Sequence, residues 1–301
     1  MTRIVLGTRN SRLALAQTDL VVARLRALSP GVEIEIRPMT TTGDRVLDRP
    51  ISEIGTKAVF TKELDEALLA GEIDAAVHSL KDLPAELPAG VAIAAVPERA
   101  SPFDCLLALG PATLDHLPAG ARLGTSSLRR RAQLRARRPD LEIVDLRGNL
   151  DTRWRRLEEG RCDALVLAQA GVDRLGWSDR VREVFDSATC LPAPCQGALV
   201  ITARAGDDRF AALDDARAAA ESACERAFLA ELGGGCDVPA AALARLAPDG
   251  TLTFRALVAN LDGSRMACDE GEAPAADAEA LGRDVARRVL ASGGRELLSA
   301  R

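Results

Sequence analysis

Residues 75–96 read AAVHSLKDLPAELPAGVAIAAV and contain the pattern that decides the fold of the first half of the chain. Residues 75–77 and 91–96 are short, continuous apolar runs, and the polar residues 78–88 separate them. Such runs indicate strands that are buried on both faces, as in a parallel sheet covered by helices. The pattern therefore predicts an α/β fold with a mainly parallel sheet, in which the loops at strand ends are the place to search for a site.

Strands and amphipathic helices alternate on both sides of this stretch. Helices are predicted over about residues 11–27 and from Thr61, as the N-cap, to Gly71, where a positive φ would end the helix. Further helices are expected over about residues 128–137 and 151–159. The other predicted strands in this part of the chain cover residues 4–6, 32–36, 105–109, 122–123, 141–146 and 164–167.

The pattern changes after Pro194. A lone strand over residues 197–202 and a long helix-prone stretch over about 208–232 come first. Strands over residues 241–245, 251–260 and 265–268 follow, joined at Asp249-Gly250 and Asp262-Gly263, which are hairpin turn signals. With a last helix over about 276–291, this part is predicted to be an antiparallel α+β domain.

The composition indicates a globular protein and excludes several kinds of chemistry. The 301 residues, 47% of them hydrophobic, suffice for two or three domains at roughly 150 residues each. No run of about eighteen apolar residues occurs and the chain starts directly with a strand-like segment, so we expect a cytoplasmic protein. Seven cysteines without a C-x-x-C pair indicate free thiols, and only two histidines argue against a histidine-based metal site or a Ser/His/Asp triad.

Charge is distributed unevenly along the chain. The net charge of −5 argues against a general attraction to nucleic acid or anionic lipid. Residues 121–139, however, contain seven arginines and no acidic residue. The three lysines, at 57, 62 and 81, all fall in another short stretch, which suggests that a compact ammonium is preferred there over a guanidinium.

The motif GTSSLRRR at residues 124–131 joins a predicted strand to a helix N-terminus. Backbone N–H groups, the hydroxyls of residues 125–127 and the guanidinium groups of Arg129 and Arg130 converge there, and such a place binds anions. Three consecutive arginines cannot all face one way, so Arg131 is expected to point to solvent. The alternative interpretation is an ordinary N-capped helix with a solvated basic face.

The motif HSLKDLP at residues 78–84 follows a predicted buried strand, so that Lys81 and Asp82 should emerge at its C-terminal end. An ionised Asp82 accepts hydrogen bonds only, which suits a pyrrole N–H or an ammonium leaving group. A Lys-Asp turn pair ahead of Pro84 is the structural alternative. His78 is most simply a core or hydrogen-bonding histidine.

Two cysteines lie on loops where a thiol could react. Cys236 follows three glycines at the end of a predicted helix, and these let the backbone flex while it presents the thiol. Cys195, in PCQG at residues 194–197, competes with it on the same reasoning, and a glycine-rich helix cap with an incidental cysteine is the structural alternative. Further arginines at loop-like places would suit a substrate with many carboxylates: Arg9, Arg147, Arg153 and Arg174.

These motifs together resemble the porphobilinogen deaminase (hydroxymethylbilane synthase) family over nearly the whole chain. The matching segments are TRNSRLA (8–14), TGD (42–44), KEL (62–64), HSLKDLP (78–84), GTSSLRR (124–130), LRGN (146–149), LPAPCQGA (191–198) and GGCDVP (234–239). The resemblance implies two α/β lobes like those of periplasmic binding proteins around an active cleft, and a smaller α+β C-terminal domain with an antiparallel sheet. We place domain 1 at residues 1–97 and 194–213, domain 2 at 98–193 and domain 3 at 214–301.

The resemblance also implies a reaction and its residues. Cys236 would hold a dipyrromethane cofactor through a thioether, on which four porphobilinogen units are added head to tail with loss of ammonia before hydroxymethylbilane is hydrolysed off. Asp82 matches the family's catalytic aspartate, which would hold pyrrole N–H groups and stabilise cationic intermediates. The positions that match carboxylate-binding residues for cofactor and substrate are Arg9, Ser11, Lys81, Thr125, Ser126, Ser127, Arg129, Arg130, Arg147, Arg153, Arg174 and Gln196.

The chain departs from the family pattern at three places. Arg12 stands where proline is common, GTKAVF at residues 55–60 replaces a more glycine-rich segment, and Pro194-Cys195 replaces a Val-Gly pair. None of these changes touches Asp82 or Cys236.

Two other functions compete with the family's reaction. A two-lobe anion-binding protein without catalysis would also gather arginines, but Cys236 on its glycine loop argues against it. A nucleic-acid-binding module built on residues 122–138 is disfavoured by the acidic net charge and by an aromatic content of 3%. We therefore expect a monomeric enzyme with porphobilinogen as substrate, and with neither a nucleic acid nor a membrane as partner.

Overall fold

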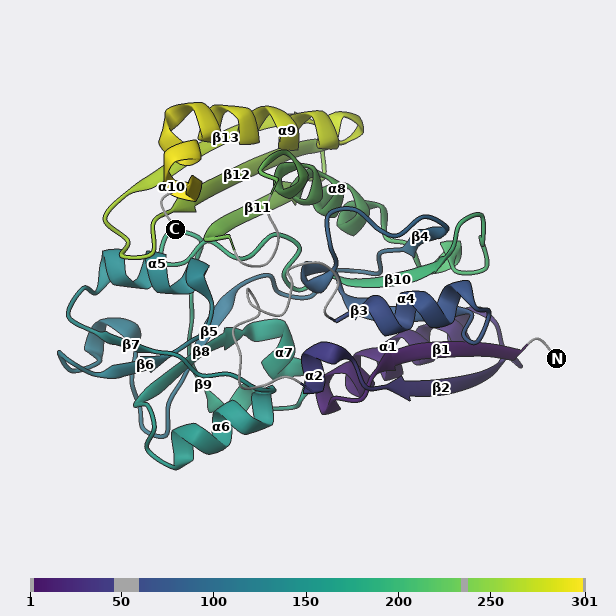
Figure 1. The fold of residues 1–301 in the computed structure, drawn as a ribbon, viewed down its shortest axis with the longest axis horizontal. Coiled ribbons are helices and arrows are strands. Elements are labelled where there is room, and N and C mark those ends of the chain that lie inside the picture. The colour runs from purple at the N-terminus through teal and green to yellow at the C-terminus, as the bar shows by residue number, and fades with distance from the viewer. Residues whose placement is uncertain (1–2, 46–59, 234–237, 300–301) are drawn as a thin grey trace. The chain divides into compact units, whose positions relative to one another are not determined.

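The computed structural model describes residues 3–45, 60–233 and 238–299 (Figure 1). The chain divides into two compact units, one made of residues 1–100 and 198–219 and the other of residues 101–197 and 220–301. No helix in the described ranges has both the length and the apolar character needed to cross a membrane.

The first unit is built on a five-stranded sheet in the order β2-β1-β3-β10-β4. β1 pairs in parallel with β2 and β3, whereas β10 runs antiparallel to both β3 and β4. Four strands run in the same direction and β10 runs against them, so the sheet is mixed, and the predicted parallel pairing holds only for β2-β1-β3. Its strands are β1 (Arg3–Arg9), β2 (Glu33–Met39), β3 (Ala75–Ser79), β4 (Val91–Ala95) and β10 (Leu199–Arg204).

β10 corrects the prediction of a lone strand after Pro194. It lies inside the first sheet, with Val200 opposite His78 and Arg204 opposite Val91. Its side chains are almost all buried, because strands cover both of its edges and the sheet is packed on its faces. β10 pairs with strands that precede it by more than a hundred residues. The local sequence of a strand does not indicate such distant partners, so the pairing depends on the tertiary fold.

The helical segments of the first unit are α1 (Arg12–Leu28), α2 (Thr42–Arg45), α4 (Lys62–Leu69) and two 3₁₀ turns, η1 (Leu80–Asp82) and η4 (Ala211–Leu213). α1 and α4 begin and end close to the predicted residues, whereas α2 and η1 were not predicted. The Ser11 hydroxyl caps α1 by accepting from Ala14 N at 3.2 Å, and Gly71 has the expected positive φ of 74° after α4. Thr61 occupies the N-cap position of α4, as predicted, but its side chain makes no capping hydrogen bond.

The second unit contains a sheet of similar design, in the order β7-β6-β8-β5-β9. β6 is parallel to β7 and β8, and β5 runs antiparallel to β8 and β9. The strands are β5 (Asp104–Leu107), β6 (Arg122–Gly124), β7 (Glu142–Val144), β8 (Ala164–Ala168) and β9 (Val181–Val184). The helical segments are η2 (Leu114–His116), α5 (Leu128–Arg137), α6 (Leu150–Glu158), α7 (Gln169–Arg174) and η3 (Ser178–Arg180).

The second unit also contains the predicted antiparallel sheet, in the order β11-β12-β13. β13 continues to Pro274, six residues beyond the predicted end at 268, because it stays in register with the whole of β12. The elements are α8 (Ala216–Glu231), which begins in the first unit, β11 (Ala240–Leu246), β12 (Thr251–Ala259), β13 (Met266–Pro274), η5 (Ala275–Asp277), α9 (Ala278–Val289), the π-helical turn η6 (Leu290–Gly294) and α10 (Arg295–Ser299).

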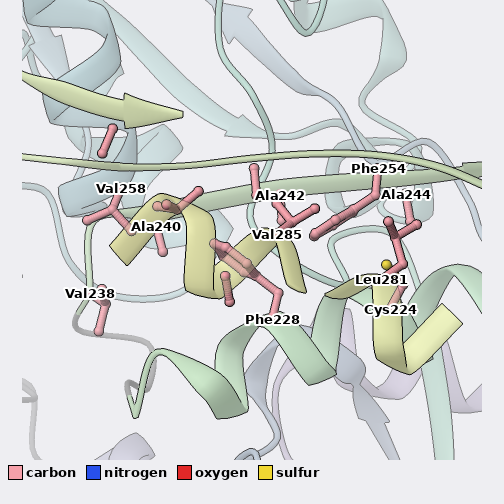
Figure 2. Close-up of a cluster of buried hydrophobic side chains, with 14 of the residues drawn as sticks. Cys224, Phe228, Val238, Ala240, Ala242, Ala244, Phe254, Val258, Leu281 and Val285 are labelled. Atoms are coloured by element: carbon pink, nitrogen blue, oxygen red, sulfur yellow. The ribbon is translucent and has the colours of Figure 1, made fainter. Parts of the chain in front are cut away.

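Helices α8 and α9 cover one face of this antiparallel sheet (Figure 2). Phe228 of α8 meets Phe254 of β12 edge to face, with ring centroids 5.7 Å apart. Both rings are fully buried, and an edge-to-face aromatic pair contributes about 1 kcal/mol beyond the area that it buries. The α/β sheets and the α+β C-terminal part therefore confirm the predicted fold class.

Candidate active site

Four of the predicted site residues follow two neighbouring parallel strands of the first unit. β1 ends at Arg9, with Ser11 two residues later, and β3 ends at Ser79, immediately before Lys81 and Asp82 in η1. Because β1 and β3 are parallel and adjacent, their carboxyl ends lie at the same edge of the sheet. The fold therefore places these residues at one edge of the sheet.

The individual side chains at this edge are held to different degrees. The Arg9 guanidinium stacks on the Phe60 ring, 4.4 Å from its centroid, which orients a cation without neutralising it. The Asp82 carboxylate is half-buried and accepts no hydrogen bond from any described residue. It is thus available to a ligand.

His78 is a structural residue, as expected. Its Nε2 lies 3.2 Å from the Thr202 hydroxyl of β10, inside the sheet. Burial, with a smaller contribution from the Arg9 charge, lowers the His78 pKa to about 4, so the imidazole is neutral at physiological pH. His78 therefore links two strands below Lys81 and Asp82 and is not a proton carrier.

In the second unit, the loop after β6 leads into α5 as predicted. The Ser127 hydroxyl caps α5 by accepting from Arg130 N at 3.4 Å, and Ser126 donates to Leu146 O at 2.5 Å. Thr125 Oγ1 accepts from Ser127 N at 3.3 Å. Each hydroxyl therefore has a role within the loop, and these bonds fix the backbone at the N-terminus of α5.

Arg129 and Arg130 are buried, with exposed fractions of 4% and 6%, and both pair with Asp104 at the start of β5. Arg129 Nη1 donates to Asp104 Oδ2 at 2.7 Å and to Leu191 O at 2.8 Å. Arg130 donates to Asp104 Oδ1 from Nε at 3.1 Å and from Nη2 at 2.7 Å. Arg131 is half-exposed, in agreement with the prediction that it points away from this cluster.

Asp104 is a residue that the sequence analysis missed. Burial opposes its ionisation, but the charges of Arg129 and then Arg130 outweigh that effect and hold its pKa well below the usual range. The only signal in the sequence was one aspartate before an apolar strand, and nothing in the sequence connects it with arginines 25 residues later.

The turn at residues 194–197 places Gln196 in the same cluster. Gln196 Nε2 donates to Asp104 Oδ1 at 2.8 Å and to Pro102 O at 2.7 Å. The preceding Cys195 has a φ of 61°, in the left-handed region that favours glycine, and its N–H donates to the Glu225 carboxylate of α8. Its side chain is 1% exposed, so this thiol is not accessible to a ligand.

Three further arginines from the predicted set lie in the second unit. Arg147 pairs with Asp145 at 3.2 Å, Arg153 Nε donates to Gly148 O at 2.9 Å, and Arg174 Nη2 donates to Gly197 O at 2.7 Å. Burial lowers the pKa of both Arg153 and Arg174 to about 10, and repulsion by Arg130 adds to the effect at Arg153. The charges of Asp145, near Arg153, and of Asp173, near Arg174, only partly offset this effect of burial.

The other cysteines differ in whether their thiols are accessible to solvent. Cys236 lies outside the described residues, as does most of the departing segment at 55–60. The six described cysteines form no disulfide with one another, and all are buried except Cys268 on β13. Burial raises the pKa of the Cys190 thiol to about 12, so it remains protonated beside Asp104. Within the described ranges, no group of histidine, cysteine and acidic side chains could hold a metal ion.

Comparisons with known proteins match the chain in two segments and over its whole length. Residues 4–212 match the family model for the porphobilinogen deaminase dipyromethane cofactor binding domain, and residues 219–291 match the model for the porphobilinogen deaminase C-terminal domain. The chain is 48% identical to porphobilinogen deaminase of Roseiflexus castenholzii over 300 residues, which are 98% of each chain. Identity to the enzymes of Desulforudis audaxviator (98% of this chain, 97% of that one) and Chromobacterium violaceum (100% and 98%) is 50% and 48%.

Two solved structures illustrate a distant resemblance to the chain. A Salmonella typhimurium periplasmic binding protein with high arginine specificity aligns with a TM-score of 0.40 at 15% identity, over 73% of this chain and 94% of its own. The Bordetella pertussis BvgS periplasmic VFT2 domain aligns with a TM-score of 0.39 at 17% identity, over 70% and 84%.

Proposed function

The chain belongs to the porphobilinogen deaminase family, and we propose that Asp82, Cys236 and an arginine-rich set of binding residues perform the family's reaction in it. The chain is a hydroxymethylbilane synthase, an enzyme of tetrapyrrole biosynthesis. It joins four porphobilinogen molecules head to tail with release of ammonia, and then hydrolyses the product to hydroxymethylbilane. Its cofactor is a dipyrromethane.

The proposed binding residues fit a cofactor and substrate that carry several carboxylates. Burial of the guanidinium groups is the largest cause of the lowered pKa values of Arg153 and Arg174. A carboxylate partner offsets the cost of such burial and forms charge-assisted hydrogen bonds with a guanidinium. When bound, the dipyrromethane supplies the primer to which new pyrrole units are attached.

Asp82 is the proposed catalytic residue. Its carboxylate is free of described partners at the end of β3, and as an acceptor it can hold pyrrole N–H groups. Its negative charge also stabilises the positive charge that develops while ammonia leaves. The neighbouring Lys81, together with Arg9 and Ser11 at the same sheet edge, would bind substrate carboxylates.

Cys236 is the proposed attachment point. Cys195, its competitor, is 1% exposed, and this inaccessibility supports the proposal for Cys236. The full proposed set that binds carboxylates of cofactor and substrate is Arg9, Ser11, Lys81, Thr125, Ser126, Ser127, Arg129, Arg130, Arg147, Arg153, Arg174 and Gln196.

The proposal divides the chain into three domains, residues 1–97 with 194–213, residues 98–193, and residues 214–301. Support comes from the three sheets, each of which has a buried cluster of its own. The proposal further places the enzyme in the cytoplasm as a monomer. The absence of disulfides among the six cysteines in the described ranges supports a reducing compartment.

The intact mass of the purified protein tests this proposal. Wild type from cells that make porphobilinogen should carry an adduct that peptide mapping places on Cys236, with further mass increments after substrate is added. Cys195→Ser should keep the adduct, while Cys236→Ala should lack both adduct and activity. Wild type without an adduct, even after incubation with porphobilinogen, would refute the mechanism, and an adduct on Cys195 would overturn the site.

A further inference from the structure

One carboxylate, that of Asp104, connects three members of the proposed binding set. Its Oδ1 accepts from Arg130 Nε, Arg130 Nη2 and Gln196 Nε2, and its Oδ2 accepts from Arg129 Nη1 at 2.7 Å. Cys190 Sγ adds a weaker contact to Oδ2 at 3.5 Å. Asp104 is fully buried, so every one of these bonds forms away from water.

The cluster has one negative and two positive charges. Asp104 is the only carboxylate within ion-pair distance of Arg129 and Arg130 among the described residues. The cluster therefore keeps one buried positive charge in excess, and Arg129 Nε is buried there without a hydrogen-bond partner. A buried excess charge is costly unless an anion approaches it, which matches a site that receives carboxylates.

The other ion pairs formed by arginines of α5 and its C-terminal end differ from the pairs that Arg129 and Arg130 form with Asp104. Arg137 pairs with Asp115 at 2.9 Å and Arg138 with Asp140 at 2.7 Å, but both carboxylates are exposed. Neither arginine belongs to the proposed binding set. Asp104 is thus distinguished by its burial and because its nitrogen donors, on Arg129, Arg130 and Gln196, all belong to the set.

We infer that Asp104 is a positioning residue, which holds Arg129, Arg130 and Gln196 in the arrangement that receives the carboxylates of cofactor and substrate. The inference rests on the proposed function. Asp104 itself would not touch the substrate. It fixes the two guanidinium planes and the amide relative to one another, and a bidentate fork recognises a carboxylate only when its plane is fixed.

The test compares Asp104→Glu and Asp104→Asn with wild type and with Asp115→Asn, a control that removes an exposed carboxylate facing the same helix. Glutamate keeps the charge but moves the carboxylate by one methylene, so the guanidiniums must shift. We expect Asp104→Glu to raise the KM for porphobilinogen at least about tenfold and to lower the fraction of protein that carries the adduct, with a thermal midpoint near that of wild type. Asp104→Asn should lower the adduct fraction further, and Asp115→Asn should change neither.

The outcomes separate this inference from the proposed function. Wild type without an adduct would refute the proposed function. A loaded wild type together with an Asp104→Glu variant of normal KM and normal adduct fraction would overturn only the inference, whatever its thermal midpoint. Failure of both Asp104 variants to fold would assign the residue a purely structural role and would overturn it as well.

Discussion

Replacing Arg130 by lysine keeps a positive charge on α5 but removes the planar fork. In the folded chain Arg130 Nε and Nη2 donate to Asp104 Oδ1, and Nη1 donates to Val166 O at 2.9 Å. These acceptors lie in different directions. A lysine ammonium on a single stem can reach one of them, so two buried charge-assisted hydrogen bonds are lost.

The magnitude follows from the number of bonds. At about 1.5 kcal/mol for each hydrogen bond to a charged group, the two lost bonds lower the free energy of unfolding by about 3 kcal/mol. For a chain of this size, roughly 2–4 °C of thermal midpoint corresponds to 1 kcal/mol, so Arg130→Lys should lower the midpoint by about 6–12 °C. The adduct fraction should fall as well, since the fork is part of the proposed binding set.

Arg131→Lys is the matched control. Its guanidinium makes no hydrogen bond with a described residue, and it lies one position further along the same helix. We expect its effect on stability to stay within about 0.5 kcal/mol. Differential scanning calorimetry and intact mass would be measured on both variants. Equal, small effects at the two positions would refute the reasoning and favour a solvated basic helix.

Three further predictions address the catalytic residue, the buried histidine and the packing of the C-terminal part. Asp82→Asn should lower turnover at least about a hundredfold with little change in thermal midpoint, and near-normal product formation would rule out its catalytic role. The pKa of His78 is about 4 in the folded chain and about 6.5 in the unfolded chain. The contribution of His78 to the free energy of unfolding is therefore fully present above about pH 6.5 and is lost as the pH falls toward 4. His78→Gln should flatten this pH dependence in a series of urea unfolding measurements. Gly282→Ala in α9 places a Cβ 2.1 Å from Cys224 O and should cost about 1–3 kcal/mol, whereas Gly110→Ala meets nothing and should be neutral in the same unfolding assay.

Local pattern was enough to predict much of the fold. The apolar runs at 75–77 and 91–96 became β3 and β4, and Asp249-Gly250 and Asp262-Gly263 became the two hairpin turns of the antiparallel sheet. These features depend on residues a few positions apart, where the side-chain period and turn geometry are set by the backbone itself. β9, by contrast, is a short edge strand with little apolar character, and the sequence analysis did not find it.

For the candidate site, local sequence pattern was enough to predict which side chains follow the strand ends: Asp82 after β3 and the two buried arginines after the α5 cap. The partners of those side chains depend on the tertiary fold. Asp104 lies 25 residues from Arg129 and 92 from Gln196, and β10 pairs with a strand more than a hundred residues earlier. A buried charge or strand edge has no water to bind, so it is stable only with a hydrogen-bonding partner elsewhere in the fold. No local periodicity of the sequence indicates where that partner lies.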